Sequence, residues 1–153
     1  MYEMIRFVIV NVIFCYAATV GFAVILNIPR RGLNACGING VAGWVVYVLV
    51  RQYSSSSMLA NLLASFAIGL VAMVCARAKK MPMILFNIPS LVPLVPGGQA
   101  YKAVRYFALD RNDVALTYLV QVGMIAGSIA VGFFLAEFVS QVYFKINGAS
   151  GRA

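Results

Sequence analysis

Long apolar runs separated by short polar stretches dominate this chain. Four of the runs are continuous, with Arg6 and Glu137 as their only charged residues, and a fifth is broken by prolines. In chain order they cover residues 5–28, 35–50, 58–76, 81–98 (the broken run) and 114–138. A helix rises about 1.5 Å per residue, so roughly 20 apolar residues cross a hydrocarbon core of about 30 Å. The pattern therefore predicts an all-α integral membrane protein with four full transmembrane helices. We expect residues 1–153 to form one transmembrane domain, with a flexible tail over 145–153.

The broken run contains Pro89, Pro93 and Pro96, followed by Gly97 and Gly98. Each proline removes a backbone donor and clashes with the preceding helical turn. In hydrocarbon, the carbonyls freed in this way cost several kcal/mol unless protein or water satisfies them. Broken apolar segments at membrane depth are typical of carriers. The run predicts a short fifth span or a re-entrant segment, and its lack of charge argues against an irregular surface loop.

The two glycines should let the backbone turn after Pro96 and present N–H groups at the start of the next helix, which is an anion-binding arrangement. Residues 99–109 mix aromatic and basic positions, which predicts an amphipathic helix before the last span. Asp113 follows a polar turn and is the expected N-cap of the final helix, from Val114 to about Phe138.

Composition supports the membrane class. The chain is 63% hydrophobic and 10% charged, whereas soluble domains average about 25% charged residues. A net charge of +8 would suggest nucleic acid binding in a soluble protein. Here most lysines and arginines lie between apolar runs, where they set topology and meet lipid headgroups. We therefore expect membrane lipids and no nucleic acid as partners, with the N-terminus outside and the C-terminus cytoplasmic.

Several kinds of chemistry lack the residues they need. The chain has no histidine, and Cys15, Cys36 and Cys75 lie in different runs without CxxC spacing. Zinc, iron–sulfur and haem sites therefore lack ligands, and we expect no metal and no cofactor. Asp110 and Asp113 could serve a membrane enzyme, but their spacing suits a turn and a cap. A nucleotide-binding GxxxxGK[ST] loop is also absent, so any transport is secondary or powered by a partner.

Small residues recur at helix-packing intervals in three runs. They are Gly37, Gly40 and Gly43 in the second run, Ser65 with Gly69 and Ala72 with Ala76 in the third, and Gly123 with Gly127 in the last. Such faces let helix backbones approach closely. Packing within the bundle is the favoured reading, and contact with another subunit is the alternative.

Polar groups inside apolar runs are candidates for function because each costs free energy to place there. The tripeptide Asn-Ile-Pro ends the first run at 27–29 and recurs at 87–89, which is weak evidence for an internal repeat. Gln121 lies in the last run. Glu137 is the only acidic residue within an apolar run. It is a candidate for proton coupling, although an interfacial position at the helix end is the favoured alternative.

Two segments together resemble a known family. They are residues 21–31 (GFAVILNIPRR), with Gly40 and Gly43 following, and residues 89–101 (PSLVPLVPGGQAY). Both are similar to the threonine/serine exporter family, in particular to its small split subunit. The resemblance implies a secondary amino-acid exporter in which a small chain pairs with a larger membrane subunit that carries an extra soluble region. Asn27, Pro29 and Arg31 match the first motif of that family, and its second motif is matched by Pro93, Pro96, Gly97 and Tyr101.

The resulting hypothesis is a subunit of a proton-motive-force-driven exporter of small hydrophilic acids, with threonine or serine implied by the resemblance, in the bacterial cytoplasmic (inner) membrane. The substrate carboxylate is expected near the N–H groups after Pro96, with Arg30 and Arg31 attracting anions at the cytoplasmic mouth. The candidate pathway residues are Asn27, Pro29, Arg31, Pro93, Pro96, Gly97, Gly98, Tyr101 and Gln121. The alternatives are an exporter of small dicarboxylates such as succinate and a non-transporting subunit that stabilises a membrane partner.

Overall fold

The computed structural model describes residues 2–54 and 56–149, and this part of the chain is helical without a strand. The elements are α1 (Tyr2–Ile25), α2 (Arg30–Tyr53), α3 (Ser57–Lys79), α4 (Ile84–Ser90), the 3₁₀ turn η1 (Val92–Leu94), α5 (Gly97–Ala108) and α6 (Asn112–Ala149). The predicted all-α class is confirmed. Three of these helices, α2, α3 and α6, are long and apolar enough to cross a membrane. The described apolar part of α1, Ile9–Ile25, is shorter, so the fourth full span stays a prediction.

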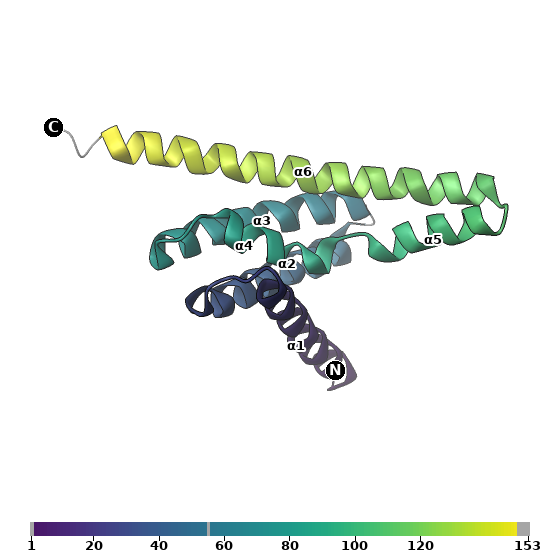
Figure 1. Cartoon of the computed structure of the whole chain (residues 1–153), viewed down its shortest axis with the longest axis horizontal. Helices are drawn as coiled ribbons and strands as arrows, with labels where there is room; N and C mark the ends of the chain where they lie inside the picture. The colour runs from purple at the N-terminus through teal and green to yellow at the C-terminus, as the bar shows by residue number, and fades with distance from the viewer. Residues whose placement is uncertain (1, 55, 150–153) are drawn as a thin grey trace.

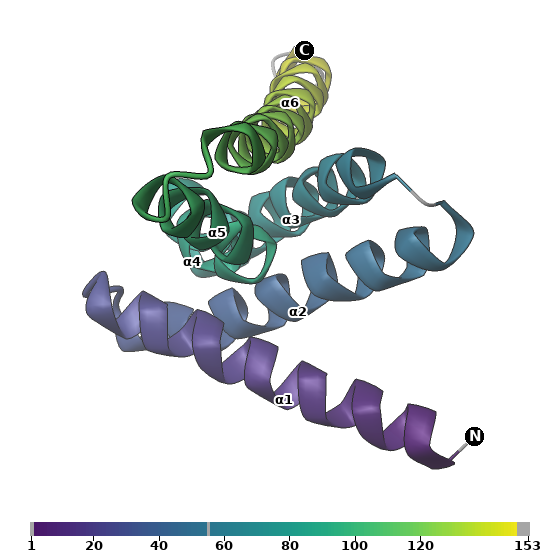
Figure 2. The same cartoon turned by 90° about the vertical axis from the view of Figure 1, so that its right-hand side faces the viewer.

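The helices form a bundle in which α1 and α6 lie at opposite edges and α2, α3 and α4 lie between them (Figure 2). The segment from α4 through η1 to α5 runs from the end of α3 to the start of α6, along the length of the bundle (Figure 1). The paired α5 and α6 extend beyond the end where α2 joins α3 (Figure 1). In this hairpin, Ala103 is buried and the ring of Tyr106 stacks on Tyr118 of α6 at 5.6 Å between centroids. The expected amphipathic helix thus packs one face on α6.

Glycines bring the long helices together. A Cβ on Gly37 would collide with the Tyr16 ring of α1, and a Cβ on Gly40 with the Thr19 side chain. Gly43 faces Ile68 of α3 in the same way. The predicted packing role of these glycines within the bundle is confirmed, because each leaves room for a side chain of a neighbouring helix.

The last helix uses its glycines differently along its length. A Cβ on Gly132, which lies outside the predicted small-residue motifs, would meet Ser65 and the carbonyl of Leu62 on α3. Gly123 and Gly127, the predicted GxxxG pair, have no atom within 4 Å of a would-be Cβ. The packing of α3 on α6 therefore depends on a glycine outside the expected motif, and the expected motif faces away from the described bundle.

Side chains of α2 donate hydrogen bonds to backbone carbonyls near the proline break between α4 and α5. Pro89 has no N–H to donate to the carbonyl of Leu85, and the Cys36 thiol donates there instead at 3.4 Å. Asn39 donates through Nδ2 to the carbonyl of Phe86 at 3.3 Å, and Ser90 Oγ donates to the carbonyl of Cys36 at 3.2 Å. The bonds from Cys36 and Asn39 supply protein partners to carbonyls near the break, as burial in an apolar environment requires, and the bond from Ser90 ties α4 to the backbone of α2.

Three helices end on non-glycine residues in the left-handed conformation. These are Asn27 (φ 58°), Lys80 (φ 51°) and Asp110 (φ 56°). After α1, the N–H of Ile28 donates to the carbonyl of Ala23 and the N–H of Asn27 to that of Val24, which is a Schellman motif. The same pair of bonds closes α3 around Lys80 and α5 around Asp110. The turn between α1 and α2 is therefore a defined helix stop followed by Pro29, the N-cap of α2.

Three sequence expectations about local structure differ from the structure. Asp113 is not the N-cap of α6, because the helix begins at Asn112 and Asp113 lies in its first turn, where its charge still favours the positive end of the helix dipole. The two Asn-Ile-Pro tripeptides are not a structural repeat, since 27–29 forms a turn and 87–89 lies within α4. The final helix also continues through Lys145 to Ala149, and the rest of the predicted tail, 150–153, lies outside the described residues.

Candidate functional site

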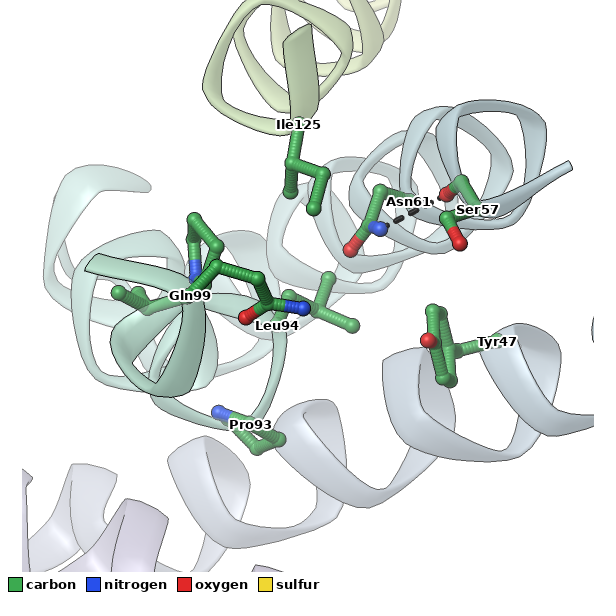
Figure 3. Close-up of a pocket in the computed structure, with 9 residues that line it drawn as sticks. Tyr47, Ser57, Asn61, Pro93, Leu94, Gln99 and Ile125 are labelled. Carbon is green, nitrogen blue, oxygen red and sulfur yellow. Dashed lines mark hydrogen bonds between the residues drawn. The ribbon is translucent and has the colours of Figure 1, made fainter. Parts of the chain in front are cut away.

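A cavity of about 180 Å³ lies where α2, α3, the proline segment and α6 meet (Figure 3). Its lining residues come from all four parts of the chain and are Tyr47, Ser57, Asn61, Pro93, Leu94, Val95, Pro96, Gln99 and Ile125. Pockets for drug-sized ligands measure about 300–1,000 Å³. This cavity therefore suits a solute of only a few heavy atoms, and its polar groups are amides and hydroxyls without a charge.

Asn61 is the most buried polar side chain of the cavity, with 3% of its surface exposed. Its Nδ2 donates to the carbonyl of Ser57 at 2.8 Å, which fixes the orientation of the amide. Its Oδ1 then points into the cavity (Figure 3) and has no donor among the residues that the structure describes. Asn61 therefore offers a hydrogen-bond acceptor to a molecule bound in the cavity.

The start of α5 supplies donors at the rim of the same cavity. The N–H of Gly97 donates to the carbonyl of Val95 at 2.8 Å, while the N–H of Ala100 donates to the carbonyl of Pro96 at 3.0 Å. The N–H groups of Gly98 and Gln99 lie in the first turn, where helix geometry provides no acceptor. Together with the helix dipole they favour an anion such as a carboxylate.

The two glycines at this helix start do not make the turn, so the expectation that they would is wrong. Neither Gly97 nor Gly98 has a positive φ. The chain turns at Pro96, with ψ at 50°, and the glycines follow as the first residues of α5. No atom lies within 4 Å of a would-be Cβ on either glycine. Their contribution is therefore an uncovered backbone that a ligand can approach.

A second cavity of about 360 Å³ adjoins the first. Its lining residues are Ser56, Ser57, Met58, Gln99, Gln121, Met124 and Ile125. Three of these, Ser57, Gln99 and Ile125, also line the first cavity. The two cavities therefore form one polar region at the end of the bundle where α2 joins α3.

The structure brings together part of the predicted site. Pro93 and Pro96 line the first cavity, Gln121 lines the second, and Gly97 and Gly98 lie at the rim. Tyr101, however, is 67% exposed and does not line either cavity.

Other predicted site residues lie far from the cavity. Asn27, Pro29 and Arg31 lie at the turn between α1 and α2 and are exposed. Pro29 is the N-cap of α2. Tyr47, which lines the cavity, lies roughly 27 Å further along the same helix, at about 1.5 Å per residue. Glu137 is exposed on α6, where its Oε1 accepts a bond from Gln141 Nε2 at 3.5 Å. These residues do not share a site with the cavity.

Sequence reasoning missed four polar residues of the cavity: Tyr47, Ser57, Asn61 and Gln99. A signal for one pair was present, because Ser57 and Asn61 are four residues apart and so share a face of the third run. No pattern in the sequence indicated that this face lies opposite the proline segment.

Comparison with known proteins supports the resemblance seen in the sequence. A family model described as "Threonine/Serine exporter, ThrE" matches residues 11–139. An uncharacterized protein of Haemophilus influenzae is 27% identical over 94 residues, which cover 61% of this chain and 32% of that relative. The matched region thus spans about a third of the length of that relative. No solved structure matches the chain significantly.

Proposed function

This chain belongs to the threonine/serine exporter family, and we propose that it is the small membrane subunit of a secondary exporter for threonine, serine or a similar small hydrophilic acid. In this proposal it works with a larger membrane subunit and is driven by the proton motive force. It lies in the bacterial cytoplasmic membrane, with the N-terminus outside and the C-terminus inside.

The observation that carries the proposal is the pairing of Asn61 Oδ1 with the start of α5 across one small cavity. A free amino acid has a carboxylate, which suits the N–H groups of Gly98 and Gln99. Its ammonium group is a donor, which suits the unpaired oxygen of Asn61. The hydroxyl of threonine or serine can then bond to Tyr47 or Ser57, which line the same cavity.

The same pairing favours an amino acid over a dicarboxylate. Ionised succinate has only acceptors, so a second carboxylate would face the acceptor oxygen of Asn61 and repel it. Succinate export remains the alternative substrate proposal. The other alternative, a subunit that only stabilises its partner, gives no reason for an unpaired acceptor in a cavity.

Charge supports the proposed orientation. Arg30 and Arg31 start α2, while Arg77, Lys79 and Lys80 lie at the end of α3. The contact of Gly32 with Met81, where a Cβ would lie 3.2 Å from the methionine Cε, places these two groups at the same end of the bundle. Loops rich in lysine and arginine favour the cytoplasmic side.

A larger partner would account for two exposed features. Gly123 and Gly127 leave a close-packing face of α6 without a neighbour among the described residues. Glu137 stays the candidate for proton coupling, and because it is exposed here, only a partner or lipid would cover it. The length of the Haemophilus relative is consistent with a second part, since this chain matches 32% of it.

The experiment is an efflux assay in cells preloaded with threonine- and serine-containing peptides. It compares cells that express this chain alone, this chain with the product of its neighbouring gene, and neither. Faster export only with both supports a two-part exporter. Unchanged export in every combination, with both proteins present in the membrane, rejects threonine and serine, and a parallel succinate assay then tests the alternative substrate.

A further inference from the structure

A further cavity lies at the opposite, basic end of the bundle, between the end of α3, the start of α4 and α6. It measures about 300 Å³, and its lining includes Met73, Ala76 and Met83. It shares no residue with the cavity around Asn61. A solute that passes through this subunit from one cavity to the other therefore has to cross the packed part of the bundle between them.

One face of α3 connects the two cavities. Asn61 lines the cavity at one end of this face and Ala76 lines the cavity at the other, about 22 Å away at about 1.5 Å per residue. Between them, at helical spacing, lie the fully buried residues Ala64, Ile68 and Ala72. Two of these three are alanines, so α3 places little side-chain volume along this line.

The proline segment packs on α3 along the same line. Met83, Asn87 and Leu91 are four residues apart in helical backbone, so they share one face of α4. Met83 lines the cavity at the basic end. Leu91 packs against the core cluster that contains Leu94, and Leu94 lines the cavity at the other end. Asn87 therefore lies midway between the two cavities.

Asn87 has a buried oxygen without a partner. Its Oδ1 makes no hydrogen bond within residues 2–54 and 56–149. Asn39 of α2 also has an unpaired, buried Oδ1, but its Nδ2 bonds to the carbonyl of Phe86 and so holds α4 on α2. Burying a polar atom without a partner is unfavourable, so an apolar side chain would suit the packing at position 87 better. A passing molecule that carries a donor gives a reason for an amide there.

We propose that the exported amino acid crosses this subunit between α3 and α4, and that Asn87 Oδ1 accepts a hydrogen bond from its ammonium group on the way. The inference rests on the proposed export function and adds a substrate-contacting residue to it. An ammonium group carries only donors, which matches an unpaired acceptor. Asn87 thus offers at mid-route the same amide oxygen that Asn61 offers in the cavity.

The fold allows α4 to separate from α3 without leaving the bundle. Hydrogen bonds of Cys36, Asn39 and Ser90 fasten α4 to α2. In the proposed opening, α4 stays attached to α2, and the gap forms on the side of α4 where Asn87 lies.

The test compares Asn87→Leu with the parent chain, each co-expressed with the neighbouring gene product in membranes. Threonine efflux at saturating internal threonine should fall about tenfold, because the ammonium group loses one hydrogen bond at the narrow part of the route. Threonine binding in the cavity around Asn61, measured as protection of Ser57→Cys from a small thiol reagent, should stay within about twofold of the parent because the two sites are well separated. The melting temperature of the purified chain should equal or exceed that of the parent, since the variant removes an unpaired buried atom.

Two further variants separate substrate contact from structure. Asn87→Asp keeps an acceptor oxygen in a side chain of the same shape and should keep at least about half of the parental efflux. Ile88→Ala is the matched control on α4, because Ile88 is 41% exposed on another face of this helix. Efflux should stay normal in that control.

Two results would overturn the inference and leave the proposed function standing. The first is normal efflux in Asn87→Leu when the parent complex exports threonine. The second is a lower melting temperature or failure to fold in Asn87→Leu together with an equal loss of efflux in Asn87→Asp, which would assign Asn87 a structural role. A parent complex that is present in the membrane but exports no threonine would instead reject the proposed function, and the inference with it.

Discussion

The two ends of this helical bundle present polar groups in opposite ways. At the end where α2 joins α3, the cavity around Asn61 encloses amides, hydroxyls and a helix start, with no charged side chain in its lining. At the other end, Arg77 and Lys80 stand beside a mainly apolar cavity. Uncharged dipoles can bind a small zwitterion and release it again, whereas lysines and arginines at a helix end favour the cytoplasmic side of the membrane. We therefore expect substitutions in the cavity around Asn61 to change transport and substitutions at the basic end to change stability.

The packing that keeps both ends in place gives the largest expected effect. Gly132→Leu forces a side chain into Ser65 and the α3 backbone, and should cost about 3 kcal/mol or prevent folding. Gly123→Leu makes the same change on the open part of α6 and should leave the melting temperature within a few degrees of the parent. Thermal unfolding followed by the fluorescence of the single tryptophan, Trp44, measures both. Equal destabilisation would mean that the two glycines do not face different surroundings.

Asn61→Leu should abolish most transport without loss of protein. The variant removes the acceptor that faces the cavity and should slow threonine efflux by about 10- to 100-fold, equivalent to a lost bond of about 1.5–3 kcal/mol to a charged group. Asn34→Leu is the matched control, because Asn34 is exposed near the basic end and bonds only to the Tyr16 hydroxyl among described residues. Efflux should stay normal in that control. Normal efflux in Asn61→Leu would remove the cavity from the transport path.

Pro96→Leu tests the helix start in the same assay. Leucine at this position restores an N–H and allows the helix to begin earlier, so the exposed amides of α5 are lost. Efflux should fall about tenfold, while the amount of the subunit in the membrane stays unchanged. Wild-type efflux in this variant would contradict the placement of the carboxylate.

The broad class of the fold was predictable from sequence, because apolar runs of membrane length leave few alternatives to helices. The proline segment was also predictable as a break, since three prolines forbid one continuous helix. The side chains that hydrogen-bond to the carbonyls near this break were not predictable. Cys36 and Asn39 donate to carbonyls of residues 49 and 47 positions later, and nothing local marks such pairs.

The candidate site was predictable only in part, for the same reason. Pro93 and Pro96 carry a visible signal, but Tyr47 and Asn61 join them only through packing between distant helices. The predicted Tyr101 shows the reverse case. It follows the conspicuous Pro-Gly motif, yet the buried side of α5 is marked by Ala103, and Tyr101 is 67% exposed.

Lys80→Gly gives the smallest effect and tests the backbone conformation at the basic end. Lys80 adopts a left-handed conformation that glycine adopts without strain. In detergent, the variant should be more stable by about 0.5–1 kcal/mol in thermal unfolding. Unchanged or lower stability would show that the left-handed conformation of Lys80 carries no strain.

The most direct test of the central claim is substrate protection of the cavity around Asn61. Ser57→Cys places a thiol in the cavity lining, and Gln52→Cys places one on the exposed end of α2. Both are made in a chain whose three native cysteines are replaced by serine, co-expressed with the neighbouring gene product in membranes. Saturating threonine should slow labelling of Ser57→Cys by a small thiol reagent at least about threefold and leave Gln52→Cys unchanged. Equal labelling rates with and without threonine at Ser57→Cys, in a complex that still exports threonine, would contradict the assignment of this cavity as the substrate site.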